Sequence, residues 1–366
     1  MEQPQAFTKA KDVSPPITET GRCAPENSSF DPFYRRVVRR TRHPVAAQIC
    51  VALILGLVFL GPHFLTTGLQ IFNDLSWMVG LMITAAMLGL FCATSTLIEL
   101  VAEADTRIPA PSKDSYVEPV RFWLSDGKFI SAGTAFGALN CLMGYSFGIQ
   151  YHTLPSELTI FLGFFIVGFV AGMAAYGLPG VLGLTRGITK ANPPLDYRDL
   201  DRCGGTSFLG QALIKFSSLN LVMGVMISIY IVFAPWTHRN QAPVRILLWA
   251  WIAFPFIVSS AHLIGPGGTI HGLLRRYKKD MQNRLATELK NIKRVIETSG
   301  EQSKELREDL EYNLTLQREL YKMRTWPFSS SSIVHYGVAF CLDTVPACWE
   351  IVKLFTEKHP PGSIGV

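Results

Sequence analysis

The chain has 366 residues, of which 48% are hydrophobic and 17% are charged. An average soluble protein has about 25% charged residues, so this composition excludes an ordinary soluble protein. The mean hydropathy is +0.24 although both ends and one long internal stretch are polar, and the net charge of +6 comes without the basic and aromatic motifs that would favour nucleic acid as a partner.

Two polar segments precede the first apolar run. Residues 1–32 are rich in Pro, Ser, Thr and Glu, which predicts a disordered tail. Residues 33–44 form a basic juxtamembrane segment, which we expect to contact anionic lipid headgroups, either by general attraction or at a specific headgroup site. Because polar residues come first, the following run is predicted to be a retained span and not a signal peptide.

Long apolar segments between residues 45 and 265 predict a domain of six transmembrane helices, because a span needs about 20 mostly apolar residues. The connections after the first, third and fifth segments are short. The predicted fold is therefore all-α, a polytopic membrane protein with three helical hairpins. The approximate spans are 45–64, 75–100, 129–149, 158–184, 208–233 and 244–264.

The Lys and Arg residues near the ends of these spans predict the orientation. One side carries the cluster at 35–42 and most other basic residues, whereas the opposite side has only Arg239 and Arg245. The positive-inside rule then places the N-terminus in the cytoplasm. We expect a plasma membrane location.

Residues 269–324 are predicted to form a charged helical extension in the cytoplasm, because the composition changes abruptly after residues 265–268. Apolar residues recur there at steps of three and four, which marks one face of a helix, and Gly300 is suited to end that helix. This association face could pack within a helical hairpin, pair with another subunit as a coiled coil, or bind a different protein. Its residues are Leu274, Met281, Leu285, Leu289, Ile292 and Ile296.

Residues 325–356 are predicted to form an interfacial helix or a seventh span, followed by a tail at 357–366. The paired apolar helices, the charged stretch and Thr325-Trp326-Pro327 before a last apolar segment resemble a type of uncharacterised bacterial multi-pass membrane protein. The resemblance covers the third predicted hairpin through Phe355. It implies this topology and a bacterial inner membrane, and it implies no substrate or catalytic residue.

Four ionisable residues fall near the predicted cytoplasmic ends of the spans: Glu99, Glu103, Lys215 and His262. Ionisable groups in membrane segments are expensive to bury and often functional, so these four could form a proton relay or a cation site. The simpler alternative is that each reaches water or snorkels to the interface.

Small and polar residues suggest helix packing or a hinge. Gly168 and Gly172 form a Gly-x-x-x-Gly pair, which permits close helix approach, and Pro179 is expected to kink the same helix. Asn140 and Asn220 occupy corresponding places in two similar stretches, 139–144 and 219–224. These asparagines are expected to bond between helices or line a pore, and the similarity reflects either duplication or chance.

Motifs for soluble chemistry are missing from the sequence. There is no Cys-x-x-Cys pair, P-loop, His-Glu-x-x-His or dinucleotide fingerprint. Residues 144–148 match the Gly-x-Ser-x-Gly pattern, but inside an apolar span. We therefore predict no enzyme, metal or cofactor. The first function hypothesis is a non-enzymatic scaffold or signalling component that associates through 269–324, and the alternative is a channel or a transporter of small solutes or ions.

Overall fold

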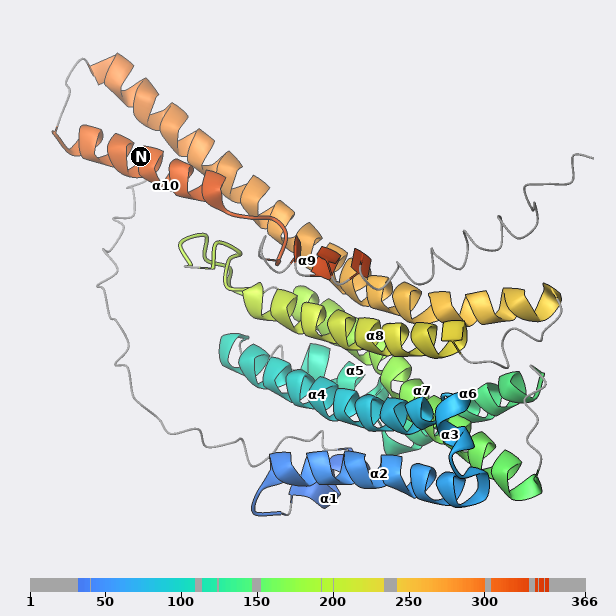
Figure 1. Ribbon diagram of the computed structural model, residues 1–366. Coiled ribbons are helices and arrows are strands. Elements are labelled where there is room, and N and C mark those ends of the chain that lie inside the picture. Colours follow the sequence, from blue (N-terminus) through green and yellow to red (C-terminus); the bar gives the residue numbers. More distant parts are fainter. Residues whose placement is uncertain are drawn as a thin grey trace, which may run out of the picture.

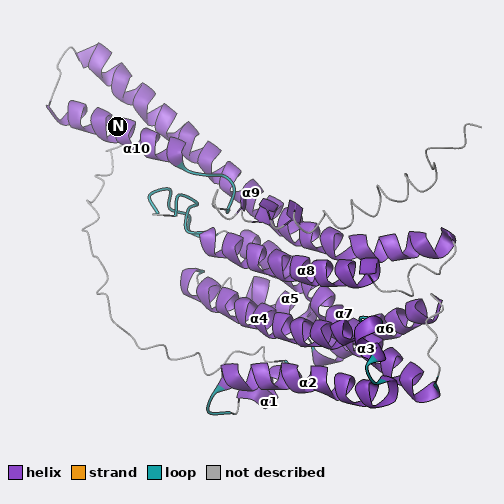
Figure 2. Cartoon of the chain, viewed as in Figure 1, coloured by secondary structure: helices purple, strands orange, loops and turns teal. Residues whose placement is uncertain are grey.

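The computed structural model describes residues 32–341 apart from 40, 109–113, 124, 147–152, 192, 200, 234–241, 300–303, 329–332, 335 and 339. All regular structure in the described residues is helical, as predicted (Figure 2). The predicted N-terminal tail up to residue 31 and the segment after residue 341 lie outside the described residues. The helices are α1 (Phe33–Arg39), α2 (Pro44–Thr67), α3 (Gln70–Asn73), α4 (Trp77–Arg107), α5 (Asp114–Trp123), α6 (Asp126–Ser146), α7 (Leu154–Lys190), α8 (Ser207–Phe233), α9 (Ala242–Ser299) and α10 (Lys304–Lys322).

Five helices in the described residues are long and apolar enough to cross a membrane: α2, α4, α7, α8 and the part of α9 that starts at Ala250. The third predicted span corresponds to α6, which is not among the five. Four glycines and Asn140 lower the hydropathy of its 21 residues. Five apolar helices of this length fit an integral membrane protein.

Consecutive apolar helices pack against each other in pairs: α2 with α4, α6 with α7, and α8 with α9 (Figure 1). This pairing matches the three predicted hairpins. Helix α7 lies at the centre, because it also contacts α2, α4, α5 and α9. Buried residues of α4, α7 and α8, among them Phe91, Leu184 and Leu213, form the main core.

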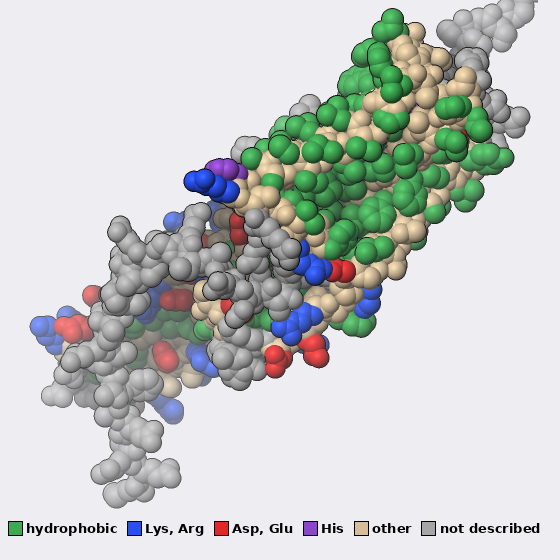
Figure 3. Space-filling view, turned by 90° about the horizontal axis from the view of Figure 1, so that it is seen from below, with side chains coloured by type: hydrophobic (Ala, Val, Ile, Leu, Met, Phe, Trp, Pro, Cys, Tyr) green, Lys and Arg blue, Asp and Glu red, His purple; other side chains and the backbone are tan. Residues whose placement is uncertain are grey.

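The outer surface of the bundle is apolar. Helix α2 leaves large side chains exposed along its length, including Val45, Leu57 and Leu65. A soluble monomer rarely exposes so large an apolar surface, whereas lipid tails cover it without cost. On the face shown in Figure 3, hydrophobic side chains cover the bundle, and charged side chains gather toward the end with the extension.

Helix α9 runs for 58 residues from the apolar bundle into the charged extension without interruption. The boundary predicted at residues 265–268 is therefore not a break in the helix. Small residues are needed there for packing: a Cβ on Gly267 would lie 2.9 Å from the ring of Phe328. Proline and glycine are tolerated inside such helices where neighbouring elements pack against them.

The extension forms an antiparallel helical hairpin, in which α10 folds back along α9 (Figure 1). We call residues 269–322 the arm. Leu285 of α9 and Leu320 of α10 are buried in the same core cluster. The Nζ of Lys278 donates to the carbonyls of Tyr321, at 3.1 Å, and Met323, at 2.7 Å, which caps the end of α10. Of the arrangements that the sequence left open, the chain itself adopts the intramolecular one.

Two short helices pack onto the bundle. In α1, Tyr34 and Val38 are buried, and the Tyr34 hydroxyl lies 2.6 Å from Thr94 Oγ1 of α4. The basic segment is thus partly attached to the bundle, with Arg36 paired to Asp126. Helix α5 was not predicted, and it packs on α7 because Gly187 leaves room for Tyr116.

Only the start of the C-terminal segment lies within the described residues. The Tyr336 hydroxyl is 2.8 Å from Ser259 Oγ, and the ring of Phe340 packs edge-on against Phe256. Both partners belong to the apolar half of α9. These contacts place Tyr336 and Phe340 beside the bundle.

Candidate functional site

The four ionisable residues predicted as one site have different polar partners. Lys215 Nζ lies 3.9 Å from Glu99 Oε2, with side chains 60% and 72% exposed. Glu103 pairs instead with Arg107 at 2.8 Å. His262 is only 3% exposed, and its Nδ1 donates to the carbonyl of Val258 at 2.9 Å. Among the described residues, these contacts do not join Glu103 or His262 to the pair formed by Lys215 and Glu99.

The glycines of α7 allow α6 to approach closely. A Cβ on Gly168 would lie 2.8 Å from Asn140 Cβ, and one on Gly172 would lie 2.8 Å from the carbonyl of Ala132. In return, Gly133 and Gly137 of α6 face phenylalanine rings of α7. This second Gly-x-x-x-Gly pair was overlooked in the sequence. Helix α7 stays helical through Pro179 to Lys190.

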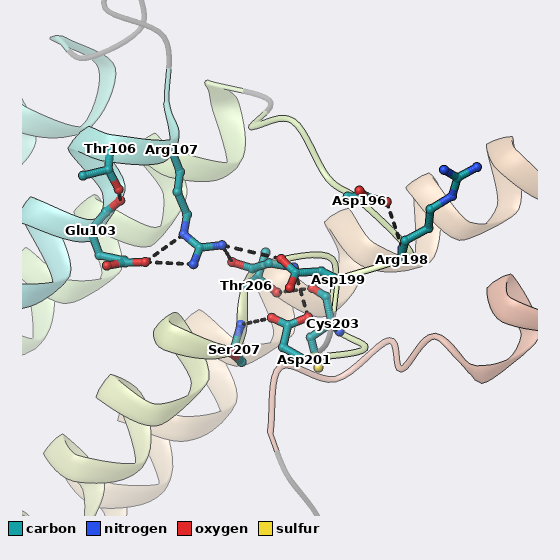
Figure 4. Close-up of polar contacts among 11 residues, drawn as sticks. Glu103, Thr106, Arg107, Asp196, Arg198, Asp199, Asp201, Cys203, Thr206 and Ser207 are labelled. Carbon is teal, nitrogen blue, oxygen red and sulfur yellow. Dashed lines mark hydrogen bonds and ion pairs between the residues drawn. The ribbon is translucent and has the colours of Figure 1, made fainter. Parts of the chain in front are cut away.

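Arg107 connects the end of α4 to the loop before α8 (Figure 4). Its Nη1 donates to the carbonyl of Gly205 at 2.8 Å and lies 3.8 Å from Asp199 Oδ2. Its Nε donates to Glu103 at 2.9 Å. The guanidinium therefore fixes the loop by planar, charge-assisted hydrogen bonds.

The same loop is organised around Asp201, whose carboxylate accepts backbone N–H groups from Cys203, at 2.6 Å, Gly205, at 3.1 Å, and Ser207, at 3.0 Å (Figure 4). Burial raises the pKa of Asp201, but these hydrogen bonds outweigh it and hold the pKa below its ordinary value. Burial and the nearby Asp201 charge raise the pKa of the Cys203 thiol to about 11. Cys203 therefore stays a neutral thiol at physiological pH.

Residues 325–328, which we call the Trp-Pro element, attach the base of the arm to the bundle. The Trp326 ring stacks on His271 of α9, with centroids 4.5 Å apart, and His271 Nδ1 donates to the carbonyl of Thr325 at 2.9 Å. Pro327 packs against Gly210 of α8. The Thr325-Trp326-Pro327 motif thus joins the base of the arm to α8 and α9.

An apolar cavity of about 130 Å³ lies between α4, α6, α7, α8 and α9. Asn140, Asn220 and Tyr230 bring polar groups to a wall of aliphatic and aromatic side chains, and no Asp, Glu, Lys or Arg lines it. A smaller cavity of about 50 Å³ adjoins it, because both are lined by Leu90, Ala174 and Asn220. His262 lines the smaller cavity. Neutral, largely apolar molecules match such a lining.

Asn140 and Asn220, from the similar stretches 139–144 and 219–224, lie in the wall of this cavity. The side-chain amide of each donates to a backbone carbonyl. Asn140 Nδ2 donates to Phe164 of α7 at 2.7 Å, as expected for a bond between helices. Asn220 Nδ2 donates within its own helix, to Phe216 at 3.0 Å, and lies 3.4 Å from His262 Nδ1. The corresponding asparagines of the two similar stretches thus line the same cavity.

A buried histidine at the other end of the bundle was not predicted. His63 of α2 is 0% exposed, and its ring nitrogens lie 2.8 Å from Thr159 Oγ1 and 3.1 Å from Ser76 Oγ. It joins α2 to α7 and to the start of α4. Its position directly after Pro62 in an apolar run gave no sign of these partners, which come from distant segments.

Comparison with known proteins adds no relative to this picture. No family model matches the chain, and no curated protein or solved structure is similar to it. Within the described residues, no group of three His, Cys, Asp or Glu side chains is placed to hold a metal ion.

Proposed function

We propose that the protein is a non-enzymatic membrane scaffold or signalling component, in which the arm recruits a partner and the bundle controls the arm. The observation that carries this proposal is the continuity of α9. Trp251, Phe254 and Val258 of this helix line the cavity, and residues 269–299 of the same helix form the arm. A change in the bundle that tilts α9 must therefore also move the arm.

The association role rests on the surface of the arm. Because α10 covers the predicted association face of α9, with Leu274 and Leu285 buried, self-association through that face would require the hairpin to open. Tyr312 and Tyr321 of α10 are exposed and offer rigid, amphipathic contact area. We therefore favour a different protein as the partner over a coiled coil with a second copy.

The location is part of the proposal. We place the protein in a bacterial inner membrane as six spans, with the N-terminus and the arm in the cytoplasm. The uneven distribution of Lys and Arg supports this orientation. The exposed Arg42 would meet anionic headgroups at that surface.

The test is capture of cross-linked partners from native membranes with the full-length protein. Leu285→Asp places a charge inside the arm hairpin and should remove the partner. Ala286→Asp places the same charge at the neighbouring exposed position and should retain it. Identical capture by both variants and the wild type would contradict recruitment by the folded arm.

A small-solute transporter is the second candidate, favoured by the two adjoining cavities. They extend from the centre of the bundle toward the end that carries His262. Swelling of proteoliposomes in a gradient of a neutral solute such as glycerol would test for transport. Flux no greater than in protein-free liposomes would remove this candidate, and flux lost in Asn220→Leu would favour it.

A further inference from the structure

We propose that the cavity binds a neutral, membrane-soluble molecule with a flat apolar body and a hydrogen-bond donor, of the alcohol or phenol class. This inference deepens the proposed function, since it names the class of molecule that the bundle would sense. The binding itself does not depend on the arm.

The size and lining of the cavity define the apolar body. Its volume of about 130 Å³ is close to that of an engineered apolar cavity of about 150 Å³ that holds benzene. One wall consists of stacked rings, with Phe136 and Trp251 centroids 6.1 Å apart and Trp251 and Phe254 centroids also 6.1 Å apart. Flat faces of this kind suit a ring.

The charge of the lining restricts the ligand to neutral molecules. No ionisable carboxylate, ammonium or guanidinium group lines either cavity. An ion bound there would lose its hydration without gaining a counter-charge, which is expensive in an apolar site. Anionic lipid headgroups and inorganic ions are therefore excluded as occupants.

The polar atoms of the wall call for a donor on the ligand. The amide nitrogens of Asn140 and Asn220 each donate to a backbone carbonyl. The Oδ1 atom of each amide therefore points away from that carbonyl. Neither Oδ1 receives a hydrogen bond from the described residues. In the adjoining cavity, His262 uses Nδ1–H for Val258, so Nε2 is also an acceptor. Acceptor atoms that receive no hydrogen bond from the protein are complementary to the hydroxyl hydrogen of a ligand.

The test uses two photoreactive probes of nearly equal shape, para-azidophenol and para-azidotoluene, with full-length protein in lipid nanodiscs. Labelled peptides are mapped by mass spectrometry. Labelling of cavity residues is divided by labelling of the exposed face of α2, which corrects for the different partition of the two probes into lipid. We expect this ratio to be about fivefold higher for the phenol, as one added hydrogen bond provides.

Three variants make the result specific. Asn220→Leu should reduce the ratio for the phenol to that of the toluene. Ala174→Phe, which fills the point shared by both cavities, should abolish cavity labelling by both probes. Leu142→Phe changes an exposed residue of α6 and should leave both ratios unchanged.

Two outcomes would overturn the inference: equal ratios for the two probes in the wild type, or cavity labelling that survives Ala174→Phe. The wild-type comparison needs no variant, so it remains decisive if a variant fails to fold. Binding of the phenol by a protein that captures no partner would contradict only the signalling role. Partner capture without phenol binding would contradict only this inference.

Discussion

Lys215 Nζ on α8 and Glu99 Oε2 on α4 lie 3.9 Å apart, and both side chains are mostly exposed. Exposed ion pairs contribute about 0–1 kcal/mol, because solvent screens them. We therefore expect Glu99→Gln and Lys215→Met to change thermal stability in detergent by less than about 1 kcal/mol. A large loss in both would show that this pair is embedded in a low-dielectric site.

The α6–α7 contact should depend on glycine at specific positions. We expect Gly172→Val to destabilise the bundle by about 1–3 kcal/mol, because the added Cβ would meet Phe136 and the backbone of Ala132. Gly177→Val is the matched control on the same helix, since a Cβ there meets nothing within 4 Å. Equal unfolding temperatures of the two variants would contradict the proposed close packing.

His63 should be a structural connector. Replacing it by leucine removes contacts with Thr159 and Ser76, and we expect a loss of about 1–2 kcal/mol, since hydrogen bonds between membrane helices are individually modest. The exposed His43 provides the control, as His43→Leu should be neutral. Denaturant unfolding in micelles measures both variants. Equal stability of both would show that His63 makes no net contribution.

The loop before α8 should be sensitive to acid. The pKa of Asp201 is lower in the folded protein than its ordinary value of 3.8, so its carboxylate stabilises the loop above that pH. This contribution is lost as the pH falls through the lower, folded-state pKa. We expect pepsin to cleave the loop faster in this pH range. The Asp201→Asn variant should be cleaved more readily than the wild type at every pH, with no further increase in this range.

The Trp-Pro element should hold the arm in place. Trp326→Ala removes the stacking on His271, and we expect the arm to become more accessible to amide exchange while the bundle keeps its protection. Tyr321→Ala, at an exposed residue nearby, should leave exchange in the arm unchanged. Unchanged exchange in Trp326→Ala would show that other contacts suffice.

Hydropathy predicted long apolar helices because a membrane span needs about 20 apolar residues, and five helices of the described residues are long and apolar enough to cross a membrane. It missed α5, whose 10 residues contribute only Tyr116 and Val120 to the core. It also placed a boundary at residues 265–268, where glycines normally indicate a turn. Gly267 instead accommodates Phe328, a partner 61 positions away in the sequence, and periodicity carries no information about such a contact.

The candidate site was predicted only in part, for a related reason. Ionisable residues drew attention to Glu103 and Lys215, yet each pairs with one oppositely charged neighbour, Arg107 or Glu99. Asn140 and Asn220 were recognised as polar residues in apolar spans, but only the packing of α6, α7 and α8 shows that they line one cavity. Shape arises from five helices together, and no single stretch of sequence encodes it.

The length of α9 has a mechanical consequence. From Val258 at the cavity to the end of the helix at Ser299 is about 60 Å at 1.5 Å per residue. Pivoting this rod by about 5° at the cavity would displace its far end by about 5 Å, close to one helical turn. A shift too small to see in the bundle would thus be magnified into a displacement large enough to separate two docked surfaces.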